Sequence, residues 1–138
     1  MSKLLLAVDG SEPALRAAAQ LADRAGPRDE IHLVNVQLPV DGLARSLAGA
    51  QAVQHFHHEE GLAAMAQARA RLDAAGLVYQ LHILVGHPAD QISRFAAEQG
   101  FDEIVMGTHG RTGLLQLLMG SVAAEVSEQA KTRVTLVK

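Results

Sequence analysis

The chain has 138 residues, a size that suits one folded domain with a single core. It contains no cysteine, which excludes disulfides, thiolate metal sites and a cysteine nucleophile. The net charge of −3 gives no basic footprint for nucleic acid, and no apolar run reaches the roughly 20 residues of a membrane span. Asp9 interrupts the first apolar run early, so we expect no signal peptide and a cytoplasmic protein.

The first half of the chain predicts two strands around a helix. Residues 4–8 form a continuous apolar run, which is typical of a strand buried on both faces. Ser11 then offers an N-cap to a helix whose apolar residues recur at helical spacing as far as Gly26. A β-branched run at 31–36 predicts the second strand. The pattern weakens over 38–56, where we expect a mobile loop with room for one short helix.

The second half of the chain repeats this alternation. Good helix formers at 59–75 predict a long helix, and Pro88 opens another that ends near Gly100. A final helix is predicted to begin at Gly120 and Ser121, after a leucine-rich turn. The remaining strands are expected at 77–85, 102–106 and 134–137.

Strands that alternate with helices predict an α/β fold. We expect a single domain over 1–138, with one open, five-stranded parallel sheet, Rossmann-like, and helices on both faces. Such sheets bind ligands beyond the carboxyl ends of the strands, where the strand order reverses. If the first and fourth strands are neighbours, Asp9–Gly10 and Gly107–Thr108 face each other across that crevice.

A glycine-rich segment follows the fourth predicted strand, with Gly107, Gly110 and Gly113 close together. Glycine lets the backbone approach an anion without a Cβ in the way, and its N–H groups can line a phosphate site. The positive end of a helix that begins at Gly120 would suit the same anion. Local chemistry leaves two interpretations open: an anion site, or a plain turn between a strand and a helix.

The spacing of these glycines resembles a known family. Gly107-x-x-Gly110, nine residues, then Gly120-Ser121 is similar to the G-2x-G-9x-G-(S/T) signature of ATP-binding universal stress proteins. The likeness extends over nearly the whole chain, including Ala-Val-Asp-Gly-Ser-Glu at 7–12 and Val-Gly-His-Pro at 85–88. It implies a fold like that of the adenine nucleotide alpha hydrolases and a bound ATP, with ADP and AMP as alternatives and Mg²⁺ carried by the phosphates.

The resemblance also implies which residues contact the nucleotide. Those at the base and ribose would be Ala7, Asp9, Val36 and Met106. Those around the ribose and phosphates would be Gly107, Thr108, His109, Gly110, Arg111, Thr112 and Gly113. Those on the phosphates would be Gly120, Ser121 and Val122. Two positions depart from the family pattern, since Gln116 stands where a basic residue is common and Arg133 where a proline is common.

Several polar residues have a plain structural interpretation beside a functional one. Asp9 can contact the base or ribose, or it can form the turn and cap the next helix. His109 can donate to the nucleotide or act as a general base, although no orienting carboxylate is near it in sequence. We predict no catalytic residue and no metal site, because His55, His57 and His58 have no partner cluster elsewhere.

Two further histidines, His32 and His82, lie in predicted strands. We expect them on a polar face of the sheet or at its edge. The leucines of 114–118 are expected to join the core or to pack over the glycine loop.

These features favour an ATP-binding regulatory module of the stress response with an unidentified protein partner. By the resemblance it would be a homodimer that pairs through the strand at 134–137. Two alternatives remain: a slow ATPase, and a dimeric scaffold that needs no nucleotide. The P-loop, dinucleotide-binding and serine-hydrolase motifs do not occur in the sequence.

Overall fold

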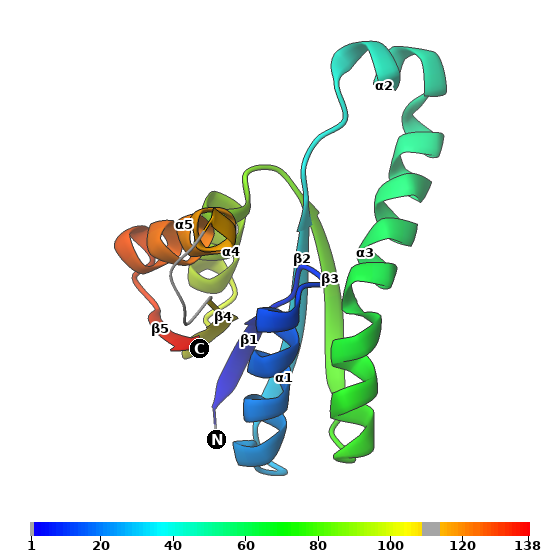
Figure 1. Ribbon diagram of the computed structural model, residues 1–138. Helices are drawn as coiled ribbons and strands as arrows, with labels where there is room; N and C mark the ends of the chain where they lie inside the picture. Colours follow the sequence, from blue (N-terminus) through cyan, green and yellow to red (C-terminus); the bar gives the residue numbers. More distant parts are fainter. Residues whose placement is uncertain (1, 109–113) are drawn as a thin grey trace.

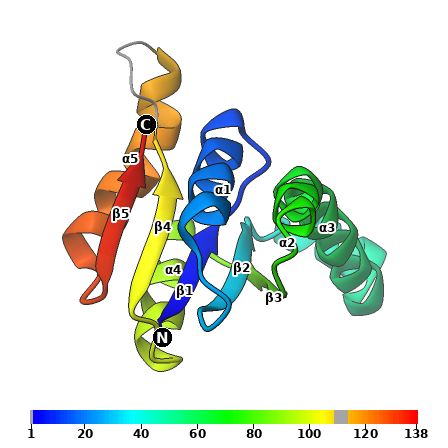
Figure 2. The ribbon, with the colours of Figure 1, turned by 90° about the horizontal axis from the view of Figure 1, so that it is seen from below.

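The computed structural model describes residues 2–108 and 114–138, and the side chains of 2–108 and 121–138. Five parallel strands form one sheet in the order β3-β2-β1-β4-β5 (Figures 1 and 2). The strands are β1 (Lys3–Ala7), β2 (Glu30–Gln37), β3 (Tyr79–Val85), β4 (Glu103–Gly107) and β5 (Arg133–Val137). The helices are α1 (Glu12–Arg24), α2 (Gly42–Ala48), α3 (Ala50–Ala74), α4 (Pro88–Glu98) and α5 (Leu114–Gln129).

The sheet separates two apolar clusters, which confirms the predicted fold class. Successive side chains of a strand point to opposite faces. Leu4 and Leu6 of β1 accordingly pack in one cluster with α1 and α3, whereas Leu5 packs in the other with α4 and α5. The first and fourth strands are neighbours, since Leu5 of β1 pairs with Ile104 of β4, so the condition for placing Asp9–Gly10 opposite Gly107–Thr108 is met.

Helix α1 begins as the sequence predicts. The Ser11 hydroxyl accepts a hydrogen bond from the backbone N–H of Ala14 at 3.3 Å, as an N-cap does. Pro13 lies in the first turn, where its missing N–H costs nothing.

The expectation of a loop with one short helix over 38–56 is correct for the short helix α2 but wrong from Ala50 onward. Helix α2 occupies part of it, and α3 begins at Ala50 rather than at 59, since alanine and glutamine at 50–54 favour a helix. Gly49, with φ of +89°, separates the two helices. Figure 1 shows α2 and the start of α3 extending beyond the sheet, and residues 41–52 are exposed. This part of α3 lacks the apolar periodicity that predicts a packed helix.

The predicted start of the last helix is also wrong. Helix α5 begins at Leu114, so Gly120 and Ser121 lie inside it rather than at its first turn. The residues at 114–119 are leucine, glutamine and methionine, which all favour a helix, and one glycine inside a helix costs only about 1 kcal/mol. The positive end of the α5 dipole is therefore not at Gly120.

His32 is buried rather than on a polar face. Its Nδ1 lies 2.7 Å from Nε2 of His82, and its Nε2 lies 2.6 Å from the Glu30 carboxylate. The two imidazole rings are stacked, with centroids 5.0 Å apart, and Phe101 meets His32 edge-on. The pKa of His82 lies below its ordinary value. Burial is the main cause, and the neighbouring His32 is the second.

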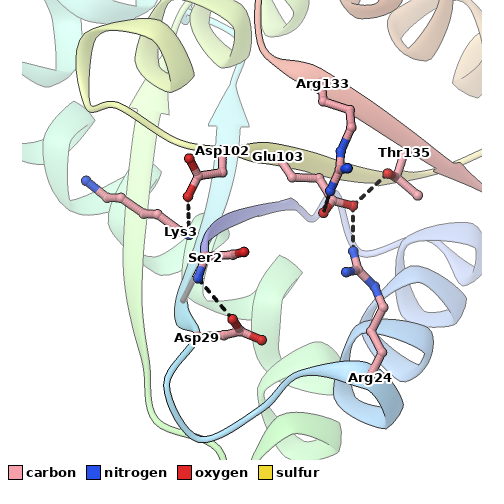
Figure 3. A network of polar contacts seen from close by, with 8 residues as sticks. All are labelled: Ser2, Lys3, Arg24, Asp29, Asp102, Glu103, Arg133 and Thr135. Atoms are coloured by element: carbon pink, nitrogen blue, oxygen red, sulfur yellow. Dashed lines mark hydrogen bonds and ion pairs between the residues drawn. The ribbon is translucent and has the colours of Figure 1, made fainter.

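A polar network joins the amino end of the sheet to α1 (Figure 3). Glu103, only 2% exposed, accepts hydrogen bonds from Arg24 of α1 and from Arg133 and Thr135 of β5. Burial raises the pKa of Glu103, but the three donors outweigh it, so the pKa lies below its ordinary value. The departure from the family pattern at Arg133 thus supplies a partner for a buried carboxylate.

Among the residues that the structure describes, no helix combines the length and the apolar character needed to cross a membrane.

Candidate functional site

An apolar pocket of about 110 Å³ opens at the carboxyl ends of the central strands. It lies between β1 and β4, where the strand order reverses, which is the position expected for a ligand in an open α/β sheet. Pockets that bind drug-sized ligands have volumes of roughly 300 Å³ or more, so this pocket is smaller than they are. The part of the pocket that the described residues form therefore encloses less than a whole ligand of that size.

The pocket brings together six of the residues that the sequence predicts for a nucleotide site: Ala7, Asp9, Val36, Met106, Gly107 and Val122. They come from β1, β2, β4 and α5, which are far apart in sequence. Five more residues complete the lining and were not predicted: Val8, Ala14, Val34, Pro88 and Ile92. The Gly-His-Pro turn at 86–88 is the sequence signal that could have placed the start of α4 beside the site.

Asp9 forms the turn between β1 and α1. Its Oδ1 accepts a hydrogen bond from the backbone N–H of Ser11 at 3.0 Å and another from the Ser11 hydroxyl at 2.5 Å. Gly10 takes a φ of +84°, which glycine adopts without steric cost. The structural interpretation of Asp9 is thus correct, and the same residue also lines the pocket.

Gly107 is required by packing, and its φ is not positive. A Cβ placed on this residue would overlap the carbonyl group of Pro13 at the start of α1. The absence of a side chain therefore lets β4 and α1 approach each other at the mouth of the pocket. The phosphate interpretation of this glycine overlooked that contact.

Among the other predicted phosphate contacts that the structure describes, Thr108, Gly120 and Ser121 belong to regular backbone structure. The backbone N–H of Thr108 donates to the carbonyl of Val137 at 2.8 Å, which extends the β4–β5 pairing. Gly120 and Ser121 lie within α5. The remaining predicted contacts, His109, Gly110, Arg111, Thr112 and Gly113, lie outside the described residues.

Asn35 is a polar residue near the pocket that the sequence analysis missed. It stands between two apolar residues of β2, is only 3% exposed, and donates from Nδ2 to the carbonyl of Val8 at 2.8 Å. A lone amide in an apolar strand was the available signal, since a buried polar side chain needs a partner.

His87 joins α4 to α5 beside the pocket. It is the N-cap residue of α4, directly before Pro88, and its Nε2 lies 2.8 Å from the Glu125 carboxylate of α5. The hydrogen bond to Glu125 raises the pKa of His87 above its ordinary value.

Comparison with known proteins identifies the family. Residues 1–138 match the universal stress protein family. The chain belongs to this family. It is 33% identical over 144 residues to universal stress protein MJ0531 of Methanocaldococcus jannaschii, covering 99% of the chain and 81% of that protein. It is 31% identical over 148 residues to universal stress protein YxiE of Bacillus subtilis, covering 99% of both.

A solved structure extends the comparison. The chain superposes on a universal stress protein in complex with cAMP with a TM-score of 0.75 and 26% identity, covering 99% of the chain and 97% of that structure. The Rossmann-like arrangement expected from the sequence is thus shared with structures of universal stress proteins.

The lining of the pocket is largely apolar among the residues that the structure describes. Among the described residues that line it, Asp9 alone is ionisable, and its Oδ1 is engaged in the turn. Within the described part of the chain there is no group of three or more histidine, cysteine, aspartate or glutamate side chains that could hold a metal ion. His57 is buried, with its Nδ1 3.5 Å from Oε1 of Gln37.

Proposed function

We propose that this universal stress protein binds an adenine nucleotide whose base occupies the apolar pocket. The observation that carries the proposal is the pocket at the β1–β4 switch point, where six residues of the predicted site meet. The faces of an adenine ring are largely apolar, and the apolar side chains of Val36 and Met106 in the lining can pack against them. A relative of 26% identity crystallised with cAMP supports an adenine ligand.

The nucleotide that we propose is ATP, with Mg²⁺ carried by its phosphates. The glycine spacing from Gly107 to Ser121 supports this choice, because it provides backbone donors beyond the pocket where the phosphates would extend. Gly120 and Ser121 lie inside α5, so their N–H groups reach a phosphate only if the preceding turns rearrange. The protein would act as a nucleotide-responsive regulator, in which ATP alters the surface offered to a partner.

Isothermal titration calorimetry with ATP and Mg²⁺ tests the proposal. We expect saturable binding that Gly110→Val and Gly120→Val abolish. Gly42→Val is the matched control, because a Cβ on Gly42 meets nothing within 4 Å and α2 does not line the pocket. Absence of binding by the wild-type protein at millimolar ATP would contradict the proposal.

We also propose that two copies pair through β5. This strand stands at the edge of the sheet, and Leu136 on it is 43% exposed. Val137 faces β4, because its carbonyl accepts from Thr108. In a parallel strand, alternate residues present their N–H and C=O groups to the same side, so those of Leu136 point outward.

Replacing Leu136 by proline tests this pairing. The substitution replaces a partly exposed side chain and removes an outward N–H but no N–H that faces β4, so β4 and β5 remain paired while the open edge loses a donor. Multi-angle light scattering should report a dimer for the wild-type protein and a monomer for Leu136→Pro. A wild-type monomer would rule the pairing out.

A further inference from the structure

The end of β1 forms one wall of the pocket. Ala7 is the last residue of β1, and the next N–H, that of Val8, still donates to the carbonyl of Val34 at 2.9 Å. The chain then turns at Asp9 and Gly10 into α1. Val8 and Asp9 both line the pocket, so whatever holds Val8 in place also sets the shape of this wall.

The Asn35 side chain holds Val8 after the ladder of backbone hydrogen bonds ends. Its Nδ2 donates to the Val8 carbonyl at 2.8 Å, and its Oδ1 accepts from Nε2 of Gln37 at 2.7 Å. Both contacts favour the same orientation of the Asn35 amide. Its Oδ1 accepts from Gln37, and its nitrogen faces the Val8 carbonyl, where an oxygen would be repelled. The amide thus gives the Val8 carbonyl a hydrogen-bond partner at the point where β1 leaves the sheet.

Asn35 acts without touching the pocket. Val34 and Val36, its neighbours in β2, line the pocket, and alternation along the strand places Asn35 on the opposite face. Its effect on a ligand would therefore pass through Val8 and Asp9.

We propose that Asn35 is a positioning residue that fixes the β1 exit and thereby the Val8–Asp9 wall of the pocket. Its effect on ligand affinity rests on the proposed nucleotide function, whereas its effect on the β1 exit does not. Two polar side chains of the described structure connect to it: Gln37, whose Nε2 donates to its Oδ1, and His57 of α3, whose Nδ1 lies 3.5 Å from Oε1 of Gln37.

The variant Asn35→Asp separates positioning from simple loss of packing. A carboxylate cannot donate to the Val8 carbonyl, but a carboxylic acid can, and burial beside a carbonyl raises the pKa of the new group. We expect the variant to bind ATP about tenfold more weakly than wild type at pH 8, and within about twofold at pH 5. Dividing the affinity of the variant by that of the wild type at the same pH removes the effect that the titration of ATP has on both.

The variant Asn35→Leu is the matched comparison, because it has a similar size and cannot donate at any pH. It should bind weakly at both pH 5 and pH 8. Equal affinity of Asn35→Asp and wild type at pH 8, or the same pH dependence for both variants, would overturn the proposal.

Amide hydrogen exchange tests the β1 exit without a ligand. In Asn35→Asp at pH 8, the N–H groups of Val8 and Ser11 should exchange faster than in wild type, while that of Leu5 is unchanged. Ile104→Val is a control that weakens the core under β1 without altering the Val8 contact. If wild type binds no ATP, the nucleotide function fails, and unchanged exchange at Val8 and Ser11 separately overturns the role of Asn35.

Discussion

At the scale of single residues, a missing side chain decides how β4 meets α1. A Cβ on Gly107 would overlap the backbone carbonyl of Pro13, and a backbone atom cannot rotate away as a side chain can. We expect Gly107→Ala to lower the free energy of unfolding by about 3 kcal/mol. Urea denaturation followed by circular dichroism measures this loss.

The control for this substitution is Gly42→Ala. A Cβ on Gly42 meets nothing within 4 Å, and alanine favours a helix over glycine by up to about 1 kcal/mol. Its stability should therefore equal or slightly exceed that of the wild type. Equal stabilities of the two variants would show that β4 and α1 are not in close contact at Gly107.

At the scale of elements, the sequence located all five strands. The central strands β1, β2 and β4 are mostly buried apolar runs, whereas β3 and β5 at the sheet edges are only partly buried and were located from their apolar and β-branched residues. The early turns of α3 were missed, because residues 41–52 are exposed and show no apolar periodicity. The early start of α5 was missed because Gly120 was interpreted as a boundary, although one glycine does not end a helix.

The candidate site could be predicted only in part for a similar reason. The resemblance to the family predicted which positions along the chain contact the ligand, and six of these positions meet at one pocket. A local pattern can single out a residue such as Asn35, but it does not identify the partner across the fold, here Val8, nor which residues such as Ile92 join the lining. Such contacts depend on which strands are neighbours, and alternation of strands and helices alone does not specify that order.

The packing of α3 on β3 gives a prediction at this scale. Gly61 of α3 lies so close to Ile83 that a Cβ would stand 2.6 Å from Cδ1 and 2.7 Å from Cγ1 of that side chain. We expect Gly61→Ala to destabilise the wild-type protein by about 1–2 kcal/mol through overpacking. In the Ile83→Ala background, the same change should stabilise by up to about 1 kcal/mol, through helix propensity. A double-mutant cycle measured by denaturation checks this reversal, and effects of the same sign in both backgrounds would contradict it.

At the scale of the whole molecule, Glu103 joins α1 to the edge strand β5 through β4 (Figure 3). Arg24 and Arg133 neutralise a carboxylate that is almost completely withdrawn from water. Glutamine has nearly the same shape but no charge, and its amide end would face donors. We expect Glu103→Gln to lower the free energy of unfolding by about 3 kcal/mol at pH 7.

The effect of pH on this variant has a definite sign. The pKa of Glu103 in the folded protein lies below the ordinary value of 4.5, so its contribution to stability is complete above pH 4.5 and is lost as the pH falls through the folded pKa. The difference between wild type and Glu103→Gln should therefore be constant from pH 7 towards pH 5 and shrink at more acidic pH. Asp23→Asn, which breaks the exposed ion pair with Arg71, should cost less than about 1 kcal/mol at every pH. If the stability difference between wild type and Glu103→Gln grew in acid, burial rather than the three donors would dominate the pKa of Glu103.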